Sequence, residues 1–150
     1  MITVNIALKP GRVIRSEVLA GLAANNAGIA VFSIPGAGPG LDRRNVFDNW
    51  KAALASPWTD IFIGMDGDVI LPHGTVDELI EGLNHFPVYV FRNKDGQKHG
   101  LWGVRLGVTL TVPFEPSVET LKFCPVCQWL TAIEKAGVKI GIGKQIVKEA

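Results

Sequence analysis

The apolar residues of the chain fall into short continuous runs that alternate with segments of helical periodicity. Runs of this length are typical of strands buried on both faces, whereas apolar residues recurring every three or four positions predict amphipathic helices. Strands are predicted at 3–8, 28–34 and 60–65, and helices from Ser16 and over 45–56. This order of strand, helix, strand, helix, strand predicts a parallel sheet with helices on its faces.

The pattern continues beyond residue 70 with another helix and two further strands. Thr75 and Glu78 have the spacing of a capping box, which predicts that a helix begins there. The segments 87–93 and 102–114 have the character of strands and are separated by the turn KDGQKHG. The second of these segments alternates in part, which predicts an antiparallel or edge strand.

One more helix and one more strand are predicted near the end of the sequence. Apolar residues at helical spacing from Val126 to Ile133 predict a helix that stops at Gly137, and 138–143 is predicted to be the final strand. No linker, internal repeat or low-complexity tract divides the chain. We therefore expect a single α/β domain over 1–150, with a mostly parallel central sheet, helices on both faces and an antiparallel edge portion.

The composition indicates a folded protein with a substantial core. The 150 residues are 47% hydrophobic and 19% charged, with a formal net charge of +1. Basic residues are scattered rather than gathered with aromatic residues in a stripe, which argues against a nucleic-acid partner. No apolar run approaches the roughly 20 residues of a membrane helix, and the first residues lack a signal-peptide pattern. We expect a cytoplasmic protein without an integral membrane segment.

An acidic pair stands where the third predicted strand ends. Asp66 and Asp68 are separated only by Gly67, and residues two apart in an extended segment point to the same side. Ligands of open α/β sheets bind beyond the carboxyl ends of the strands, where this pair is expected. Carboxylate oxygens suit Mn2+ or Mg2+. An ordinary polar turn is the alternative, whereas an EF-hand is excluded because Ile70 and Leu71 occupy positions requiring an oxygen ligand and a glycine.

The sequence around this pair resembles the GT-A glycosyltransferases, which use nucleotide sugars and carry a D-x-D motif. In 49–83 an Ala-containing helix leads to a strand, an acidic motif, a proline and a further helix, and MDGDVILP holds the motif position. The stretch 4–12 is similar to the first strand and nucleotide-facing loop of that family. The stretch 129–147 is similar to its last helix and strand, so the resemblance extends over most of the chain.

The resemblance implies roles for particular residues. It implies that Asp66 and Asp68 hold the metal ion, Mn2+ or Mg2+. It further implies that a nucleotide-diphosphate sugar is contacted by Pro10, Arg12, Arg43, Arg44 and Asp66. The expected reaction is transfer of the sugar to an unknown acceptor.

Some positions depart from the family pattern. The family carries one or two carboxylates at the start of its last helix, and one of them is the catalytic base of inverting members. The stretch CPVCQ at 124–128 contains no acid, which leaves Glu119, a few residues upstream, as the candidate base. Lys148 lies near the point where the family frequently has a His ligand. A catalytically inactive nucleotide-sugar-binding module of the same fold is therefore the principal alternative function.

Two cysteines suggest a third hypothesis. Cys124 and Cys127 form C-P-V-C before a predicted helix, a pattern similar to the redox motif of glutaredoxins. A helix N-terminus favours the thiolate of a nearby cysteine. However, the motif of that family follows its first strand, whereas here it comes near the end of the sequence, and small packing residues are the alternative. A zinc site is weakly indicated, because the only other candidate ligands are dispersed, namely His73, His85 and His99. The glycines of 36–40 lack the spacing of a dinucleotide-binding loop.

Overall fold

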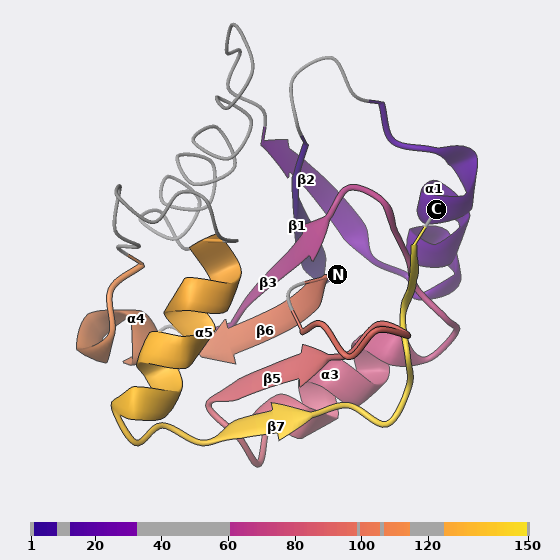
Figure 1. The fold of residues 1–150 in the computed structure, drawn as a ribbon. Coiled ribbons are helices and arrows are strands. Elements are labelled where there is room, and N and C mark those ends of the chain that lie inside the picture. The colour runs from indigo at the N-terminus through magenta and orange to yellow at the C-terminus, as the bar shows by residue number, and fades with distance from the viewer. Residues whose placement is uncertain are drawn as a thin grey trace, which may run out of the picture.

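A computed structural model of the chain describes residues 2–8, 13–32, 61–98, 100–105, 107–114 and 125–149. Figure 1 shows the strands crossing the middle of the molecule with helices around them. The strands are β1 (Thr3–Ala7), β2 (Gly28–Phe32), β3 (Ile61–Asp66), β4 (Val69–Ile70), β5 (Val88–Phe91), β6 (Leu101–Arg105), β7 (Ile140–Ile142) and β8 (Lys148–Glu149). The helices are α1 (Ser16–Ala24), α3 (Thr75–Leu83), α4 (Gly107–Thr111) and α5 (Pro125–Lys135).

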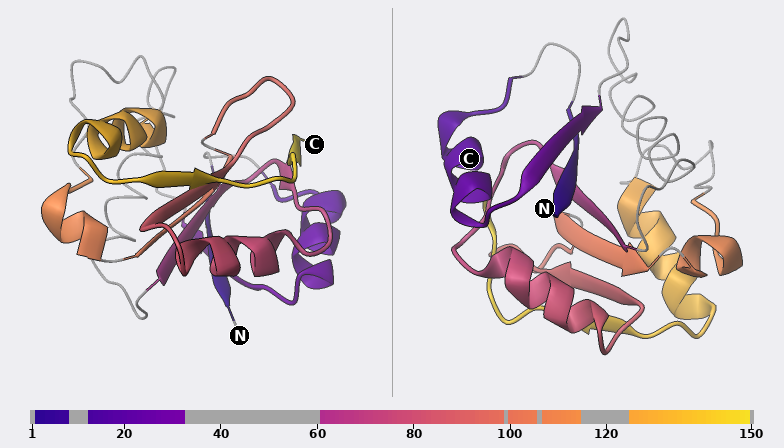
Figure 2. Two further views of the ribbon diagram at one scale, coloured as in Figure 1. Left: turned by 90° about the horizontal axis from the view of Figure 1, so that it is seen from below. Right: turned by 180° about the vertical axis from the view of Figure 1, so that it is seen from behind.

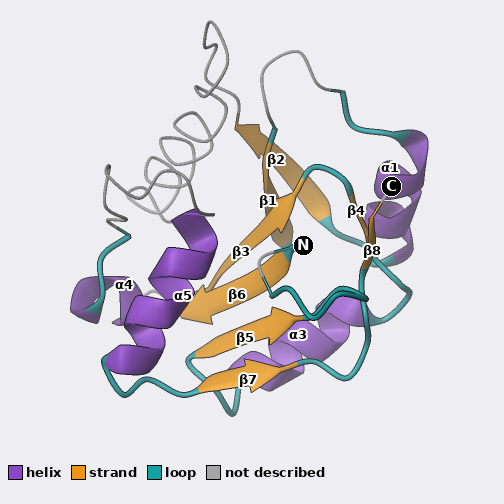
Figure 3. Cartoon of the chain, viewed as in Figure 1, coloured by secondary structure: helices purple, strands orange, loops and turns teal. Residues whose placement is uncertain are grey.

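Most of the strands form one mixed, six-stranded sheet in the order β2-β1-β3-β6-β5-β7 (Figure 3). β1 is parallel to β2 and β3, and β5 is parallel to β7, whereas β6 is antiparallel to both of its neighbours. In Figure 1 the arrow of β6 accordingly points opposite to that of β5. The carboxyl ends of the other five strands therefore meet along one side of the sheet, which we call the carboxyl edge.

Helices cover both faces of this sheet, and each face has its own apolar core. Figure 2 shows α5 on one side of the sheet and α3, with α1, on the other. The core beneath α1 and α3 includes Val4, Ile6, Val18, Leu22, Ile63, Met65 and Leu79. The core beneath α4 and α5 includes Phe62, Val90, Trp102, Val108, Trp129 and Ile133. The fold predicted from the sequence, a mostly parallel sheet with helices on both faces, is confirmed.

A cluster of aromatic side chains fills the α5 face. Trp102 of β6 is fully buried and meets Trp129 of α5 edge to face, with ring centroids 5.6 Å apart. The indole N–H of Trp129 donates a hydrogen bond to the carbonyl oxygen of Val112, at 2.8 Å. The Trp102 ring lies directly over Gly64 of β3, where an added Cβ would come within 2.2 Å of the ring. The packing of this face therefore requires a residue without a side chain in the strand that leads to Asp66.

The predicted continuous strand over 102–114 is wrong. β6 ends at Arg105, and α4 begins at Gly107. Val108 in α4 and Val112 just after it lie one helical turn apart, and both pack in the α5-face core. Tertiary burial therefore outweighs the preference of β-branched residues for strands. The expected antiparallel element is β6, which lies inside the six-stranded sheet, between β3 and β5, rather than at its edge.

The predicted helix near residue 75 is confirmed, but its predicted capping box is wrong. Gly74, in the left-handed conformation with φ of 82°, is the N-cap, and Thr75 is the first helical residue. The Thr75 hydroxyl donates back to the Pro72 carbonyl oxygen. The backbone N–H of Val76, in the first turn of the helix, is instead capped by Asn25, whose Oδ1 accepts from it at 3.0 Å. A residue from the end of α1 thus replaces the local cap.

The helix predicted to stop at Gly137 is confirmed as α5, and Gly137 has a φ of 84° just after it. The predicted helix at 45–56 and the loop at 36–40 lie outside the described residues. Within the part of the chain that the structure describes, no helix is long and apolar enough to cross a membrane.

Candidate functional site

The acidic pair lies in a turn at the carboxyl edge, and both ends of the turn are anchored in the core. Asp66 is the last residue of β3, and its backbone N–H donates to the carbonyl oxygen of Gly100 at 3.0 Å. Met65 before the turn and Val69 after it are buried. Asp66 itself is half-buried and Asp68 is exposed. The backbone carrying the carboxylates is therefore held in place while Asp68 faces solvent.

The local geometry differs from the extended segment assumed from the sequence. Gly67 and Asp68 form a turn between β3 and β4, so Asp68 does not continue the alternation of the strand. Alternation along β3 puts Asp66 on the same face as Phe62, which belongs to the core beneath α5. The structure brings the two residues to one turn at the expected edge. Their joint binding of a cation stays a prediction.

The C-terminal strand adds a further carboxylate beside this turn. β8 pairs with β4 in antiparallel fashion, and Glu149 lies opposite Val69, the residue that follows Asp68. The Glu149 side chain accepts a hydrogen bond of 2.7 Å from the buried carboxamide of Asn93. Sequence reasoning missed both residues. The turn sequence N-K-D-G signals a loop after β5, but no local pattern indicates a contact with a residue 56 positions further on.

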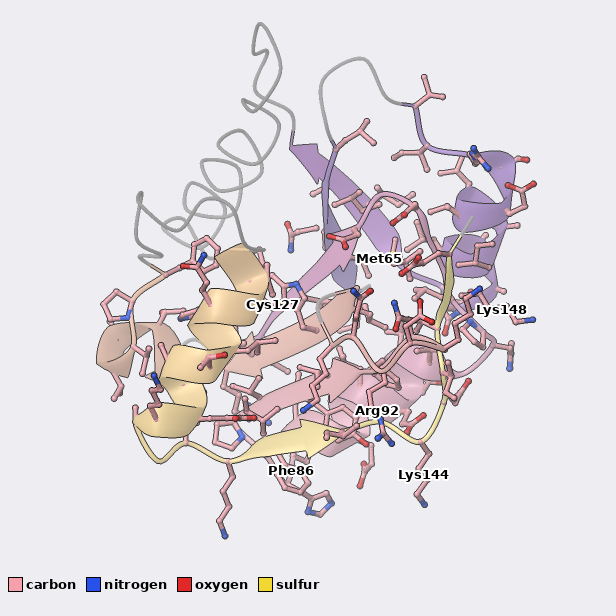
Figure 4. The ribbon with its side chains drawn as sticks, viewed as in Figure 1. Met65, Phe86, Arg92, Cys127, Lys144 and Lys148 are labelled. Carbon is pink, nitrogen blue, oxygen red and sulfur yellow. The ribbon has the colours of Figure 1, made fainter. Side chains whose placement is uncertain are left out.

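Basic residues border the same edge. Arg92 follows β5, Lys144 follows β7 and Lys148 belongs to β8, and all of them are exposed. Figure 4 labels them, together with Met65 at the end of β3 and Cys127 on α5. Basic and acidic side chains therefore both occur at the carboxyl edge, and these are the side-chain types that bind phosphate groups and divalent cations, respectively.

The acidic pair alone offers few protein ligands. No group of three or more His, Cys, Asp or Glu side chains is arranged to hold a metal ion among the residues that the structure describes. Mg2+ commonly binds through one or two carboxylates, with water and substrate phosphates completing its octahedral shell. An exposed and a half-buried aspartate on one turn fit that mode of binding better than a closed, all-protein site.

A second ionisable cluster connects α3 to the strands behind the site. Burial, followed by the nearby carboxylate of Glu78, raises the pKa of Tyr89 above its ordinary value of 10.0. The Tyr89 hydroxyl hydrogen-bonds to Glu78, and Glu78 also accepts from the backbone N–H of Lys144 at 2.6 Å. Glu78 therefore joins α3, β5 and the segment after β7, and its role in the described structure is architectural.

The competing cysteine and histidine sites receive little new support. Cys127 is half-buried in the first turn of α5, and Cys124 lies outside the described residues, so the redox hypothesis stays a prediction. The His85 ring lies 3.2 Å from the Glu81 carboxylate, one turn away, and His73 is exposed. Of the remaining predicted site residues, those outside the described part of the chain are Pro10, Arg12, Arg43, Arg44 and Glu119.

Comparison with known proteins gives likenesses in structure alone. No protein-family model matches the chain, and no curated protein matches it in sequence. A Desulfovibrio desulfuricans protein assigned as a nucleotide-diphospho-sugar transferase aligns with a TM-score of 0.59 and 14% identity, covering 94% of this chain and 78% of that chain.

Another match is glucosyl-3-phosphoglycerate synthase from Mycobacterium tuberculosis. Its complex with Mn2+, UDP-glucose and phosphoglyceric acid aligns with a TM-score of 0.66 and 10% identity, covering 99% of this chain and 71% of that chain. Its complex with Mg2+ and UDP aligns with a TM-score of 0.62 and 13% identity, over the same shares of the two chains. At these identities the likeness concerns the fold. The chain has the GT-A-like fold of nucleotide-diphospho-sugar transferases.

Proposed function

We propose that the protein is a glycosyltransferase that transfers a sugar from a metal-bound nucleotide-diphosphate sugar to an acceptor. The observation that carries the proposal is the Asp66–Asp68 turn at the carboxyl edge of a sheet with the nucleotide-diphospho-sugar transferase fold. Ligands of open α/β sheets bind beyond this edge. The metal present in complexes of the structurally similar M. tuberculosis enzyme supports the same cofactor here, Mn2+ or Mg2+.

In this proposal the acidic turn holds the donor. Asp66 and Asp68 would hold the cation, and the cation would neutralise the negative charge that develops on the leaving diphosphate. The hydrogen bond from Asp66 N–H to the Gly100 carbonyl oxygen fixes the turn before the donor arrives. Pro10, Arg12, Arg43 and Arg44 are proposed to contact the nucleotide, because Arg can bind phosphate oxygens in bidentate fashion.

A proton must leave the acceptor hydroxyl during transfer. Glu119 is the proposed base in an inverting reaction. The first described residues of α5 supply no carboxylate, since Val126 is part of the core and Cys127 and Gln128 follow it. This observation favours the second candidate function, a nucleotide-sugar-binding module that does not catalyse transfer.

Ligand-dependent stabilisation tests donor binding. The thermal unfolding temperature is measured with millimolar MnCl2, with UDP or GDP, and with metal and nucleotide together. Binding at about 100-fold above Kd stabilises the folded state by about 2.7 kcal/mol, so a rise of several degrees with the combination is expected. Asp68→Asn should abolish the rise, whereas Glu134→Gln, which removes one negative charge from exposed α5 surface, should retain it. An unchanged unfolding temperature for the wild-type protein with every combination refutes the proposal.

Turnover separates the two candidate functions. A panel of UDP- and GDP-sugars is incubated with the protein and Mn2+, and release of nucleoside diphosphate is followed with and without candidate acceptors. Release that depends on Asp68 supports a transferase. Stabilisation by ligand without any release supports the binding module.

A further inference from the structure

The segment from Gly143 to Glu149 is attached to the site by contacts that are remote in sequence. The Gly143 N–H donates to the Val90 carbonyl oxygen at 2.7 Å, and the Val147 N–H donates to the Arg92 carbonyl oxygen at 3.1 Å. Val147 is buried in the same core as Val69. The segment therefore runs from β7 past the end of β5 and reaches β4, where β8 pairs with the strand that begins directly after Asp68.

One side chain connects this segment to the loop between β5 and β6. Asn93 is 6% exposed, and its Oδ1 accepts hydrogen bonds from the backbone N–H groups of Asp95, at 3.0 Å, and Gln97, at 2.9 Å. Its Nδ2 donates to Oε1 of Gln97 at 2.9 Å and to Oε1 of Glu149 at 2.7 Å. Both polar atoms of the carboxamide therefore form hydrogen bonds. The oxygen accepts from backbone N–H groups within the loop, and the nitrogen links the loop to β8.

The other end of the loop touches the acidic turn directly. Gly100 accepts the Asp66 N–H, and a Cβ at Gly100 would come within 3.3 Å of Val69 and 3.8 Å of Val147. Asp66 and Val69, on either side of Gly67–Asp68, are therefore braced by the loop and by β8. The Asn93–Glu149 hydrogen bond connects the two supports of the turn, the loop and β8, to each other.

We propose that Asn93 is a positioning residue for the metal-binding turn: by holding Glu149, it keeps β8 on β4 and so fixes Asp68 relative to Asp66. This inference rests on the proposed function, because it assigns the turn to a metal-bound donor. Asn93 does not contact the donor. It acts through Glu149, and a hydrogen bond to a charged group is stronger than one between neutral groups.

Exchanging the donor and the acceptor of this hydrogen bond isolates its contribution. Asn93→Asp retains an oxygen for the N–H groups of Asp95 and Gln97 but sets a second carboxylate against Glu149, which should detach β8. Glu149→Gln alone retains an oxygen acceptor for Asn93 but removes its charge, so it should weaken the contact by less than Asn93→Asp does. The double variant with both substitutions restores a complementary pair, in which the new amide at 149 donates to the new carboxylate at 93.

Two measurements are made on the full chain. Hydrogen–deuterium exchange without ligand is followed in peptides covering 66–70 and 143–149, with α5 as the internal reference. The Kd for UDP, or for GDP if that nucleotide gives the larger thermal shift, is measured at saturating Mn2+. We expect Asn93→Asp to accelerate exchange in both peptides and to raise the Kd about tenfold, the size that the loss of one charge-assisted hydrogen bond allows. The double variant should return to within about threefold of wild type.

Several results would overturn the inference. One is unchanged exchange over 66–70 in Asn93→Asp, and another is a double variant as impaired as Asn93→Asp alone. A Glu149→Gln variant that loses as much affinity as Asn93→Asp would show that the carboxylate itself contacts the ligand. Absence of nucleotide binding by the wild-type protein refutes the proposed function and, with it, the role for metal; the exchange data then decide separately whether Asn93 braces the turn.

Discussion

Substituting Gly64 tests the packing that positions β3 and its terminal Asp66. Gly64 pairs with Trp102 across the β3–β6 ladder, and a Cβ there would lie 2.2 Å from Cζ2 and 2.4 Å from Cε2 of the indole ring. Trp102 has little room to withdraw, because it is fully buried and contacts Phe62 and Trp129, each with ring centroids 5.6 Å away.

The expected cost of Gly64→Ala follows from two opposing effects. Overpacking of a filled core costs about 1–3 kcal/mol, whereas replacing glycine restricts the unfolded chain and recovers about 0.4–1 kcal/mol. We therefore expect a net loss of about 1–2 kcal/mol in the free energy of unfolding. Gly107→Ala is the matched control, because a Cβ at Gly107 meets no heavy atom within 4 Å, and this variant should be neutral or slightly more stable.

Urea denaturation monitored by circular dichroism measures both variants. Combining Gly64→Ala with Trp102→Phe should show a coupling of about 1 kcal/mol or more, since the smaller ring leaves room for the added methyl group. The reasoning is refuted if Gly64→Ala unfolds at the same urea concentration as wild type, or if the double variant loses the plain sum of the two single effects. In either case the indole ring would not be confined as described.

Three further predictions concern the rest of the scaffold. Because the pKa of Tyr89 is raised, its neutral form contributes stability that is present below pH 10.0 and is lost as the pH rises through the raised value. Chemical denaturation from about pH 8 to about pH 11 should therefore show that the free energy of unfolding falls less with rising pH in Tyr89→Phe than in the wild-type protein. Asn25→Ala removes hydrogen bonds to Gly21, Pro72 and Val76, and should lower the free energy of unfolding by about 1–3 kcal/mol in chemical denaturation. Leu110→Ser, at a residue 88% exposed, should change that free energy by less than about 0.5 kcal/mol, and a larger loss would reveal an unrecognised contact.

Several features of this protein could be predicted from sequence because they depend on local patterns. Short apolar runs predict β1, β2 and β3, and the spacing of apolar residues predicts α1 and α5, because both patterns report the burial of an element independently of its neighbours. The location of Asp66 and Asp68 at the carboxyl edge follows from the same reasoning, since a βαβ order makes consecutive strands parallel. The GT-A-like fold was predicted from the resemblance around this acidic turn, and the structural likenesses confirm it.

Other features required the tertiary structure. The stretch 107–111 contains β-branched residues yet forms α4, because a helix turns Val108 towards the core beneath α5. Thr75 and Glu78 have capping-box spacing, but Asn25 caps α3 and Glu78 bonds instead to the Lys144 N–H. In each case a contact between distant segments competes with a local one, and the local pattern contains no information about that competitor.

The candidate site divides in the same way. The sequence alone determined which acids stand at the end of β3, because strand length and the residue that follows a strand are local properties. Only the tertiary structure decided what holds those acids in place: the antiparallel insertion of β6, which brings Gly100 to Asp66, and the bond from Asn93 to Glu149. Such contacts form when chain segments separated by tens of residues become neighbours, and their energy depends on burial that no segment achieves by itself.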